Sequence, residues 1–383
     1  MVDVKEFPGL RSLHPAVFCT RPYDVIGDAE LVALRQNPDS VVHIILPEGD
    51  NDKRYENARN AYTRLSEKLV RDEPSIYFYE ESNAEFKQRG FIFGVSLDDY
   101  EHGAIKKHEQ TREKPLQDRM KHIETLQMNT GLVWTVFKHN HGMKTMMDII
   151  TSMNPIADFE KYGYRHRFWK LNDLKRIAEI KTLFNHVPLY IADGHHRIAA
   201  AYHVWKKIGG EDAKYVMVFA ASDDEVRILP YNRVITTVDH QGFMDKLSEY
   251  MQVELLEQLR PPMKHEIQMY YNAQWWSLIP KHKPSGLVET LDVSILQSHL
   301  LQPVLGIYDI RNDPTIFFIG GNVSRDEYQK LVDEEHNAIV FYLHPTSIQE
   351  LEAVADAARD MPPKSTWFDP KLLTGLVFHT FDD

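Results

Sequence analysis

The chain has 383 residues, of which 43% are hydrophobic and 11% aromatic, a composition typical of a globular protein of roughly two to three domains and not of a disordered one. Its 44 basic and 56 acidic residues give a formal net charge of −12, which counts against non-specific binding to duplex nucleic acid, since that binding needs clustered Lys and Arg. The single cysteine, Cys19, excludes an internal disulfide and any zinc site that takes two or more cysteine ligands from one chain.

In chain order, short apolar runs alternate with longer helical patterns. The apolar runs predict strands at Val41–Leu46, Ser75–Tyr79, Gly90–Val95, Leu132–Phe137, Val187–Ala192, Tyr215–Ala221, Thr315–Ile319 and Ala338–Leu343. The helical patterns lie at Arg54–Arg71, Leu116–Asn129, Asp173–Phe184, Ile198–Ile208, Phe243–Tyr250, Leu291–Leu301, Arg325–His336 and Ile348–Arg359. Helix-capping patterns join Ser324 to Glu327, and Thr346 or Ser347 to Glu350. The alternation predicts an α/β protein with mixed sheets, not a helical bundle or a β-sandwich.

The chain contains no low-complexity tract and no repeat with a period of 20–50 residues. Three regions are expected: an N-terminal α/β region at 1–154, a central region at 155–239 and a C-terminal α/β region at 240–383. No run approaches 18 consecutive apolar residues, and the N-terminus lacks the basic region, apolar run and cleavage site of a signal peptide. A cytoplasmic protein without a membrane partner is therefore expected.

The sharpest local signal lies at residues 187–202, where the apolar strand Leu189–Ala192 leads through Asp193 and Gly194 into an alanine-rich helix. In such a turn the first N–H groups of the helix and the positive end of its dipole face one spot, which is an anion site. The three residues after the glycine add donors, and an arginine can hold a phosphate with two parallel bonds: His195, His196 and Arg197. The alternative is that Asp193 only caps the helix. Adjacent histidines at a helix start point apart, so a shared metal ion is not expected.

A second signal is the basic segment Ile105–His122. Its cations are Lys106, Lys107, His108, Arg112, Arg119 and Lys121. Glu109 lies among them, and nearby cations favour its ionised form. This segment is expected to fold over the same pocket as the turn, because one polyanionic ligand would explain both clusters of positive charge. The alternative is a solvated charged loop and helix face. The spacing of His108, Glu109 and Arg112 matches no zinc-protease motif.

Two further polar segments are Arg21–Ile26 and Met361–Lys371. The second is either a packed terminal arm or a contact to an anionic ligand, through Lys364, Ser365, Thr366 and Lys371. The chain has no P-loop, no Gly-x-Gly-x-x-Gly after a strand, no Gly-x-Ser-x-Gly and no protein-kinase signature. A phosphotransferase with this sequence would not belong to a common class.

The sequence of Ala192–Ala201, ADGHHRIAAA, resembles a large family of domains of unknown function that is labelled ParB-like or SpoOJ-like. Other matching segments lie along nearly the whole chain, at Arg21–Ile26, Lys107–Thr111, Leu291–Ile295, Gly320–Gly321 and Met361–Leu376. The middle of the chain resembles the ParB/sulfiredoxin-like fold, with a strand near Arg165–Lys170, a helix, a second strand and the Asp193–Arg197 turn. The resemblance implies a ParB/sulfiredoxin-like core with flanking α/β regions.

That fold family includes the free-serine kinases, which phosphorylate L-serine with ADP or ATP. The resemblance implies that the Asp193–Arg197 turn cradles nucleotide phosphates and that a carboxylate acts as base on the serine hydroxyl. Glu109, which lies in the family's own signature, is the first candidate base. Asp173 is the second, and a histidine such as His196 is the third. Asp193 would hold Mg²⁺, directly or through water.

The remaining residues expected to bind phosphate or nucleotide are the turn and the start of the basic segment: Asp193, Gly194, His195, His196, Arg197, Lys107, His108 and Arg112. The first hypothesis for function is phosphotransfer between a nucleotide and serine or phosphoserine, in either direction, with ATP or ADP and Mg²⁺ as cofactors. The second is a ParB-like protein that binds nucleotide or nucleic acid, although ParB proteins have Glu-Arg-Arg where this chain has His195, His196 and Arg197. The third is a regulator that binds its ligand without catalysis.

Overall fold

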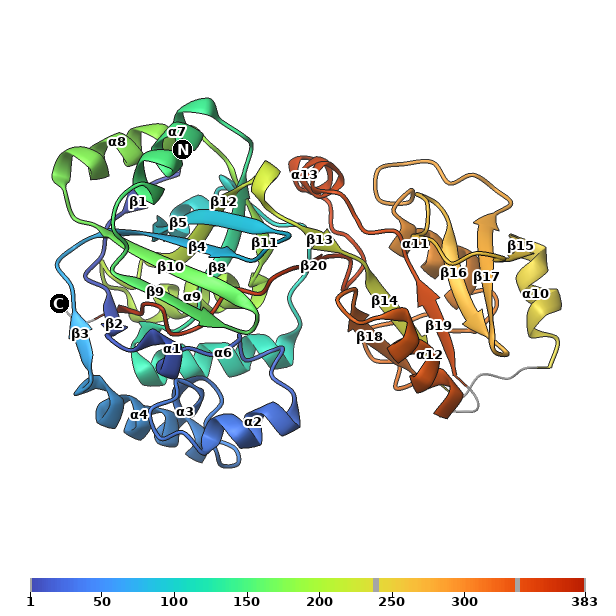
Figure 1. Cartoon of the computed structure of the whole chain (residues 1–383), viewed down its shortest axis with the longest axis horizontal. Coiled ribbons are helices and arrows are strands. Elements are labelled where there is room, and N and C mark those ends of the chain that lie inside the picture. Colours follow the sequence, from blue (N-terminus) through green and yellow to red (C-terminus); the bar gives the residue numbers. More distant parts are fainter. Residues whose placement is uncertain (1, 237–240, 335–337, 382–383) are drawn as a thin grey trace. The chain divides into compact units, whose positions relative to one another are not determined.

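The structure is a computed structural model that describes residues 2–236, 241–334 and 338–381. The chain divides into two compact units. The first comprises Met1–Lys107, Thr111–Val226 and Pro370–Asp383, and the second comprises His108–Gln110 and Arg227–Asp369. The predicted mixed α/β class is confirmed (Figure 1). The three sequence regions and the ParB/sulfiredoxin-like core stay predictions, and the boundary expected at Asp239 lies outside the described residues.

The first unit contains a nine-stranded mixed sheet of order β6-β11-β8-β12-β5-β4-β10-β9, with β1 beside β5. In chain order its strands are β1 (Val4–Lys5), β4 (Ile76–Ser82), β5 (Lys87–Ser96), β6 (Ile105–Lys106), β8 (Val133–Phe137), β9 (Ala157–Lys161), β10 (Tyr164–Leu171), β11 (Leu189–Asp193) and β12 (Tyr215–Ser222). The pairs β6–β11 and β8–β12 are parallel, and the other described pairs of this sheet are antiparallel. All of β5 after its first residue is buried, as expected for a strand covered on both faces.

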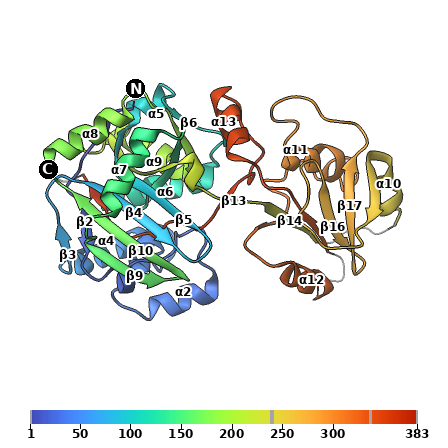
Figure 2. The same cartoon turned by 45° about the horizontal axis from the view of Figure 1, so that its top comes forward.

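The longer helices that pack their apolar residues into the main core of this unit are α6 (Glu113–Leu126), α7 (His141–Thr151), α8 (Leu174–Phe184) and α9 (His195–Ile208). In α8 the buried residues Ile177, Ile180 and Phe184 recur at helical spacing and form one apolar face. The ring of Phe184 meets those of Phe93 and Phe137 edge-on, with centroids 4.8 and 5.3 Å apart. Helices α7 and α8 lie side by side in both views (Figures 1 and 2).

The opposite face of the sheet is covered by both ends of the chain. Tyr77 alternates with the core residue Phe78 and so points to this face, where its ring lies on that of Phe168 with a centroid distance of 5.3 Å. The two chain ends meet in backbone bridges, Leu10 with Phe378 and Thr20 with Thr374. The shorter elements of this unit are β2 (Leu10–Ser12), α1 (Pro15–Phe18), α2 (Asp28–Arg35), α3 (Val42–Ile45), α4 (Lys53–Ser66), β3 (Leu69–Arg71), α5 (Leu97–Glu101), β7 (Met128–Asn129), η1 (Asp223–Glu225) and β21 (His379–Thr380).

The second unit is built on a six-stranded antiparallel sheet of order β15-β17-β16-β19-β14-β18. Its strands are β14 (Tyr231–Ile235), β15 (Met251–Leu255), β16 (Ile267–Tyr271), β17 (Gln274–Pro280), β18 (Ile316–Gly320) and β19 (Ile339–Tyr342), and a separate ribbon pairs β13 (Ile228–Leu229) with β20 (Trp367–Phe368). Its helices are α10 (Phe243–Tyr250), α11 (Asp292–Leu296), the π-helical turn η2 (Gln297–Leu301), α12 (Arg325–Glu334) and α13 (Ile348–Asp356). Asn272 and Ala273 both have positive φ, 50° and 58°, which fits the two-residue turn between β16 and β17.

Most predicted strands and helices are present, with shifted ends, but one predicted strand is wrong. Val41–Leu46 contains helix α3, whose residues Val42, Ile44 and Ile45 are fully or almost fully buried. A short apolar run has no period that separates a buried strand from a buried helix. The helix predicted to end at Arg71 stops at Ser66 and is followed by β3. The predicted end of α12 at His336 lies outside the described residues.

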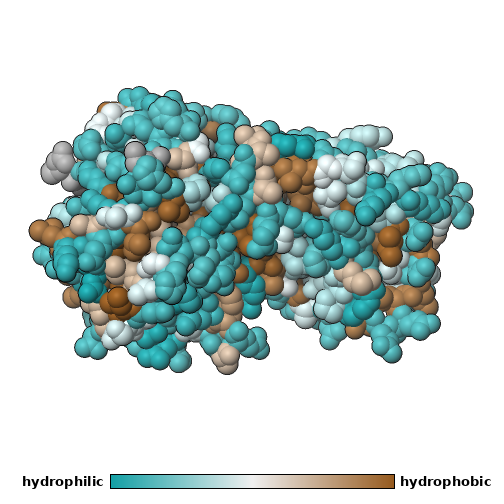
Figure 3. Space-filling view, turned by 90° about the horizontal axis from the view of Figure 1, so that it is seen from above, coloured by the Kyte–Doolittle hydropathy of each residue, from teal (hydrophilic) through white to brown (hydrophobic). Residues whose placement is uncertain are grey.

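The capping patterns are confirmed at both predicted helix starts of the second unit. Ser347 and Glu350 form a reciprocal capping box at α13, and Ser324 exchanges hydrogen bonds with Glu327 at α12. Among the described helices, none is long and apolar enough to cross a membrane. On the face drawn in Figure 3, hydrophilic residues cover most of the surface and hydrophobic residues are interspersed among them.

Candidate functional site

The predicted site lies at the end of the first unit's sheet where the parallel strands β6 and β11 finish. Strands β6 and β11 are parallel, with Lys106 opposite Tyr190, so their carboxyl ends lie at the same end of the sheet. Strand β8 runs antiparallel to β11, with Trp134 opposite Asp193, so β8 begins there. Ligands of open α/β sheets bind outside the carboxyl ends of parallel strands. The topology therefore directs the turn after β11 and the loop after β6 to the edge where a ligand site is expected.

The turn after β11 has the predicted order of strand, glycine and helix. Gly194 has a φ of 97°, the left-handed conformation that favours glycine. A Cβ atom added there would lie 2.9 Å from Nε of Arg197, so a larger residue would also displace that guanidinium. Helix α9 begins at His195, and no side-chain hydrogen bond caps it within the described part of the chain. Its first turn carries the positive end of the helix dipole.

The carboxylate of Asp193 is held by two cations and does not cap α9. Arg197 donates from Nη2 to Oδ2 at 2.9 Å, and Nζ of Lys371 lies 3.6 Å from the same oxygen. The three side chains are 24%, 14% and 13% exposed, respectively. Burial lowers the pKa of Arg197, but the carboxylates of Asp193 and Asp24 more than offset this effect, and its pKa is raised overall. Asp193 thus positions a charged arginine beside the helix N-terminus.

The same contacts bear on the predicted magnesium ligand. Mg²⁺ is held in proteins by carboxylate oxygens and keeps several waters. The two cations beside Asp193, Arg197 and Lys371, repel a divalent cation at the oxygen they already approach. Asp193 in this arrangement does not fit a direct magnesium site.

The basic segment after β6 is joined to the start of α9 inside the first unit. The backbone N–H of Arg112 donates to Nε2 of His196 at 2.9 Å. An accepting ring nitrogen carries no proton, so this bond selects the neutral tautomer of His196 with its proton on Nδ1. Lys106 lies over the ring of Tyr190, with Nζ 5.5 Å from the centroid. Both ends of the loop 107–111 are therefore anchored beside β11 and α9.

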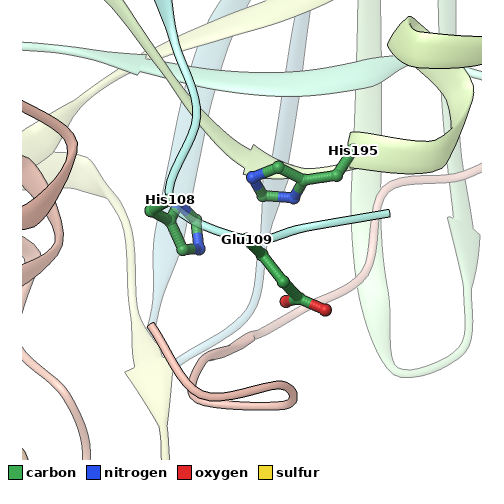
Figure 4. A group of neighbouring side chains, drawn as sticks. All are labelled: His108, Glu109 and His195. Carbon is green, nitrogen blue, oxygen red and sulfur yellow. The ribbon is translucent and has the colours of Figure 1, made fainter. Parts of the chain in front are cut away.

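The middle of that loop, His108–Gln110, belongs to the second unit by its contacts. The backbone N–H of Met361 donates to the carbonyl oxygen of His108 at 2.7 Å, and Gln110 donates to Asp360 at 2.8 Å. Figure 4 shows His108 and Glu109 as successive residues whose side chains leave the loop in different directions, and it shows His195 on the first turn of α9. His108 is buried, and Glu109 is partly exposed.

The structure does not bring Asp173 to the turn. This residue caps α8, where its carboxylate accepts a hydrogen bond from the backbone N–H of Arg176 at 2.9 Å. Helix α8 follows β10, and β10 is separated from β11 by four intervening strands. Five strand spacings of about 4.8 Å amount to roughly 24 Å, far beyond hydrogen-bond reach. The sequence predicted that Asp173 lies near the turn because α8 directly precedes β11 along the chain, but the order of strands in the sheet places the residue and the turn far apart.

The other predicted residues divide between the turn and the surface. Lys107 and Arg112 have exposed side chains, and His195 is buried with 7% of its surface exposed. The sequence analysis gave no role to some of the residues that lie around Arg197. Tyr23 and Thr374 line a pocket with Arg197, and both lie in segments that were noted for their polarity or resemblance without a role. The signal that would have found them is the family resemblance of those two segments.

A family model described as "Protein of unknown function (DUF1015)" matches residues 4–294. The chain belongs to this family. The family description carries no ParB or SpoOJ label, so that part of the sequence resemblance stays a prediction. No curated protein matches the chain.

Three solved structures illustrate the range of structural likeness. SbnI with a C-terminal truncation, from Staphylococcus aureus, is 14% identical with a TM-score of 0.40, and the match covers 74% of this chain and 85% of that chain. A free serine kinase in complex with AMP is 13% identical with a TM-score of 0.38, covering 74% and 92%. A conserved hypothetical protein from Pyrococcus furiosus is 13% identical with a TM-score of 0.37, covering 74% and 95%. Likenesses this weak carry no argument about the chemistry of this chain.

Proposed function

We propose that this member of the DUF1015 family transfers a phosphoryl group between a nucleotide and the hydroxyl of a small molecule, with serine or phosphoserine as the substrate. The observation that carries the proposal is the Gly194 turn, where the helix N-terminus of α9 and the guanidinium of Arg197 lie together at the end of the parallel strands β6 and β11. The choice of serine rests on the sequence resemblance to free-serine kinases alone.

In this proposal the phosphates of ATP or ADP lie against the first turn of α9. Backbone N–H groups there point along the helix axis toward an anion, and the helix dipole favours negative charge. Arg197 supplies a charged fork of donors, which Asp193 holds in place. Lys371 adds a second positive charge, beside the same oxygen of Asp193 that Arg197 approaches. Such fixed charges stabilise the negative charge that builds up on a phosphoryl group during transfer.

Glu109 is proposed as the base that takes the proton of the attacking hydroxyl. It lies three residues from each anchor of its loop, Lys106 and Arg112, so the chain keeps its Cα within about 11 Å of both. Burial lowers the pKa of Arg233 to about 9, yet this arginine stays charged at pH 7 and attracts the carboxylate of Glu109. As the hydroxyl oxygen bonds to the terminal phosphorus, the bond from phosphorus to the bridging oxygen breaks and the nucleotide leaves with that oxygen's electrons.

The test is incubation of the purified full chain with ATP or ADP, with and without L-serine, followed by ³¹P NMR. Phosphoserine and the shortened nucleotide in equal amounts, formed only with serine present, support the proposal. Nucleotide binding without any product would instead support a non-catalytic regulator. Tight, salt-sensitive DNA binding would support the ParB-like alternative.

Replacing Arg197 with Ala is expected to weaken nucleotide binding by about 1.5–3 kcal/mol, the range for a hydrogen bond to a charged group. Isothermal calorimetry with ADP measures this change. Arg59→Ala is the matched control, because Arg59 lies exposed on α4 and its loss removes the same charge. Equal affinity of the Arg197→Ala and Arg59→Ala variants would remove the turn from the nucleotide site.

A further inference from the structure

A pocket lined in part by Arg197 lies entirely within the first unit. Its polar lining residues include Tyr23, Arg119, His122, Asn129, Arg197 and Thr374. The residues of the whole lining come from segments far apart in the sequence: the polar turn 21–26, helices α3 and α6, strand β7 with the loop before β8, the start of α9 and the C-terminal segment. The bridge between Thr20 and Thr374 brings the first and last of these segments together.

We propose that this pocket binds one small anionic group, the carboxylate or the phosphoryl group of the small-molecule substrate. The inference rests on the proposed function for the identity of that substrate and for the role of Arg197, which serves both sites. The binding of an anion here is nevertheless testable without any turnover.

The walls of the pocket are rich in hydrogen-bond donors and carry two positive charges. Arg119 and Arg197 are both largely buried, and the ring of Tyr23 lies under the guanidinium of Arg119, 4.2 Å from centroid to carbon. Thr130 and Thr374 add hydroxyl groups. Among the described residues that line the pocket there is no carboxylate. Such a wall selects for a negative group and against a cation.

Each arginine is already fixed by one carboxylate outside the lining. Arg119 donates from Nε and Nη2 to Asp118, and Arg197 donates from Nη2 to Asp193. A guanidinium has five N–H donors in a rigid fork, so these bonds orient each group and leave other N–H directions for a ligand. Gly131 lies directly beside Arg197, since a Cβ added to it would be 3.5 Å from Nη1.

Asn129 adds to the lining a hydrogen-bond donor without a partner among the described residues. The residue is 5% exposed, and its Nδ2 amide has no hydrogen-bond partner in the described part of the chain. A buried donor without a partner costs about 1–3 kcal/mol, and an acceptor bound in the pocket would recover this cost. An anion in the pocket would accept from this amide. His122 does not compete, because burial lowers its pKa to about 3 and its Nε2 donates to the carbonyl oxygen of Ile44.

The size of the pocket limits the ligand to one small group. Its cavity volume is about 30 Å³. A single water needs roughly 10–15 Å³ of such volume. The cavity therefore has room for a carboxylate or for the oxygens of one phosphoryl group, and not for a nucleobase or a sugar. The pocket therefore complements the nucleotide site at the turn and does not duplicate it.

The test compares wild type with Asn129→Asp, which keeps the shape of the side chain and replaces the donor by a negative charge. Calorimetric titrations use inorganic phosphate, L-serine and phosphoserine. We expect at least one of them to bind wild type and to bind the variant at least about tenfold more weakly, the loss of one charge-assisted hydrogen bond. If the variant loses only the binding of phosphate, the pocket is assigned to the phosphoryl group. If it loses only the binding of L-serine, the pocket is assigned to the carboxylate.

The matched control is Asn185→Asp, which adds the same charge at an exposed position just after α8 and should bind like wild type. If Asn129→Asp does not fold, Asn129→Ser removes the amide without adding charge and carries the same test. The inference is overturned if none of the three ligands binds wild type, or if the folded Asn129 variants bind them as wild type does. Absence of nucleotide binding and of product, with phosphate binding intact, would instead overturn the proposed function alone.

Discussion

Replacing Glu109 with Gln is expected to slow phosphotransfer by roughly 10²–10⁴-fold, the usual contribution of a general base. The substitution keeps the size of the side chain and removes the group that accepts the hydroxyl proton. Nucleotide affinity should stay within about twofold, because the phosphates are held at the Gly194 turn in the proposed site. Single-turnover rates and ADP titrations, measured on the same preparation, separate the two effects.

Asp173→Asn is the matched control, since it removes the same charge at a carboxylate that only caps α8. Its turnover should equal that of wild type, with a loss of stability of about 1 kcal/mol or less, because an amide oxygen still caps. Normal turnover of the Glu109→Gln variant with loss in Asp173→Asn would move the base to Asp173. Normal turnover in both would make His195 or His196 the candidate.

Replacing Asp292 with Asn is expected to stabilise the second unit at pH 8 by up to about 4 kcal/mol and to change little at pH 4. Asp292 begins α11, is 6% exposed and accepts a hydrogen bond from the backbone N–H of His265 at 2.8 Å. Burial, together with the nearby carboxylate of Glu350, raises its pKa from 3.8 to about 7. The amide oxygen of an asparagine can still accept that bond, while the charge is removed.

The sign of the pH dependence follows from the two pKa values. In the unfolded chain the carboxyl loses its proton near pH 3.8, whereas in the folded chain it keeps the proton to about pH 7. The contribution of this carboxyl to the free energy of unfolding is therefore largest below about pH 4, falls as the pH rises to 7 and is constant above pH 7. Urea unfolding of both proteins at pH 4 and pH 8 measures the difference.

The control for this change is Asp326→Asn, which removes a charge from an exposed position on α12. It should alter stability by less than about 1 kcal/mol at both pH values. A gain for Asp292→Asn that is the same at pH 4 and pH 8 would contradict the assignment, because the gain would then not come from removing a charge.

The local parts of the fold follow from the sequence, because they depend on neighbouring residues. The turn after β11 is one example, since Gly194 between an apolar strand and an alanine-rich helix leaves few alternatives. The capping box of Ser347 and Glu350 is another. The helix at Val42–Ile45 was predicted wrongly as a strand, because its three buried apolar residues are too few to show a period.

The long-range parts of the site do not follow from the sequence. Asp173 precedes the turn by only 20 residues, yet the sheet order places β10 five strand positions from β11. Conversely, Tyr23, Asn129 and Thr374 line one pocket although more than 100 residues separate each from the next. Strand order and the return of the C-terminal segment decide these distances, and neither leaves a periodic signal in one chain.

The division of the chain has a consequence for folding during synthesis. The second unit is inserted into the first, because residues 370–381 rejoin the first unit after Arg227–Asp369. Lys371, which pairs with Asp193, and Thr374, which lines the pocket, are therefore made after the whole second unit. A growing chain that has produced only the first 226 residues lacks the segment that bridges Leu10 and Thr20. The proposed pocket and the ion pair of Lys371 with Asp193 can therefore form only after residues 371–374 have been made.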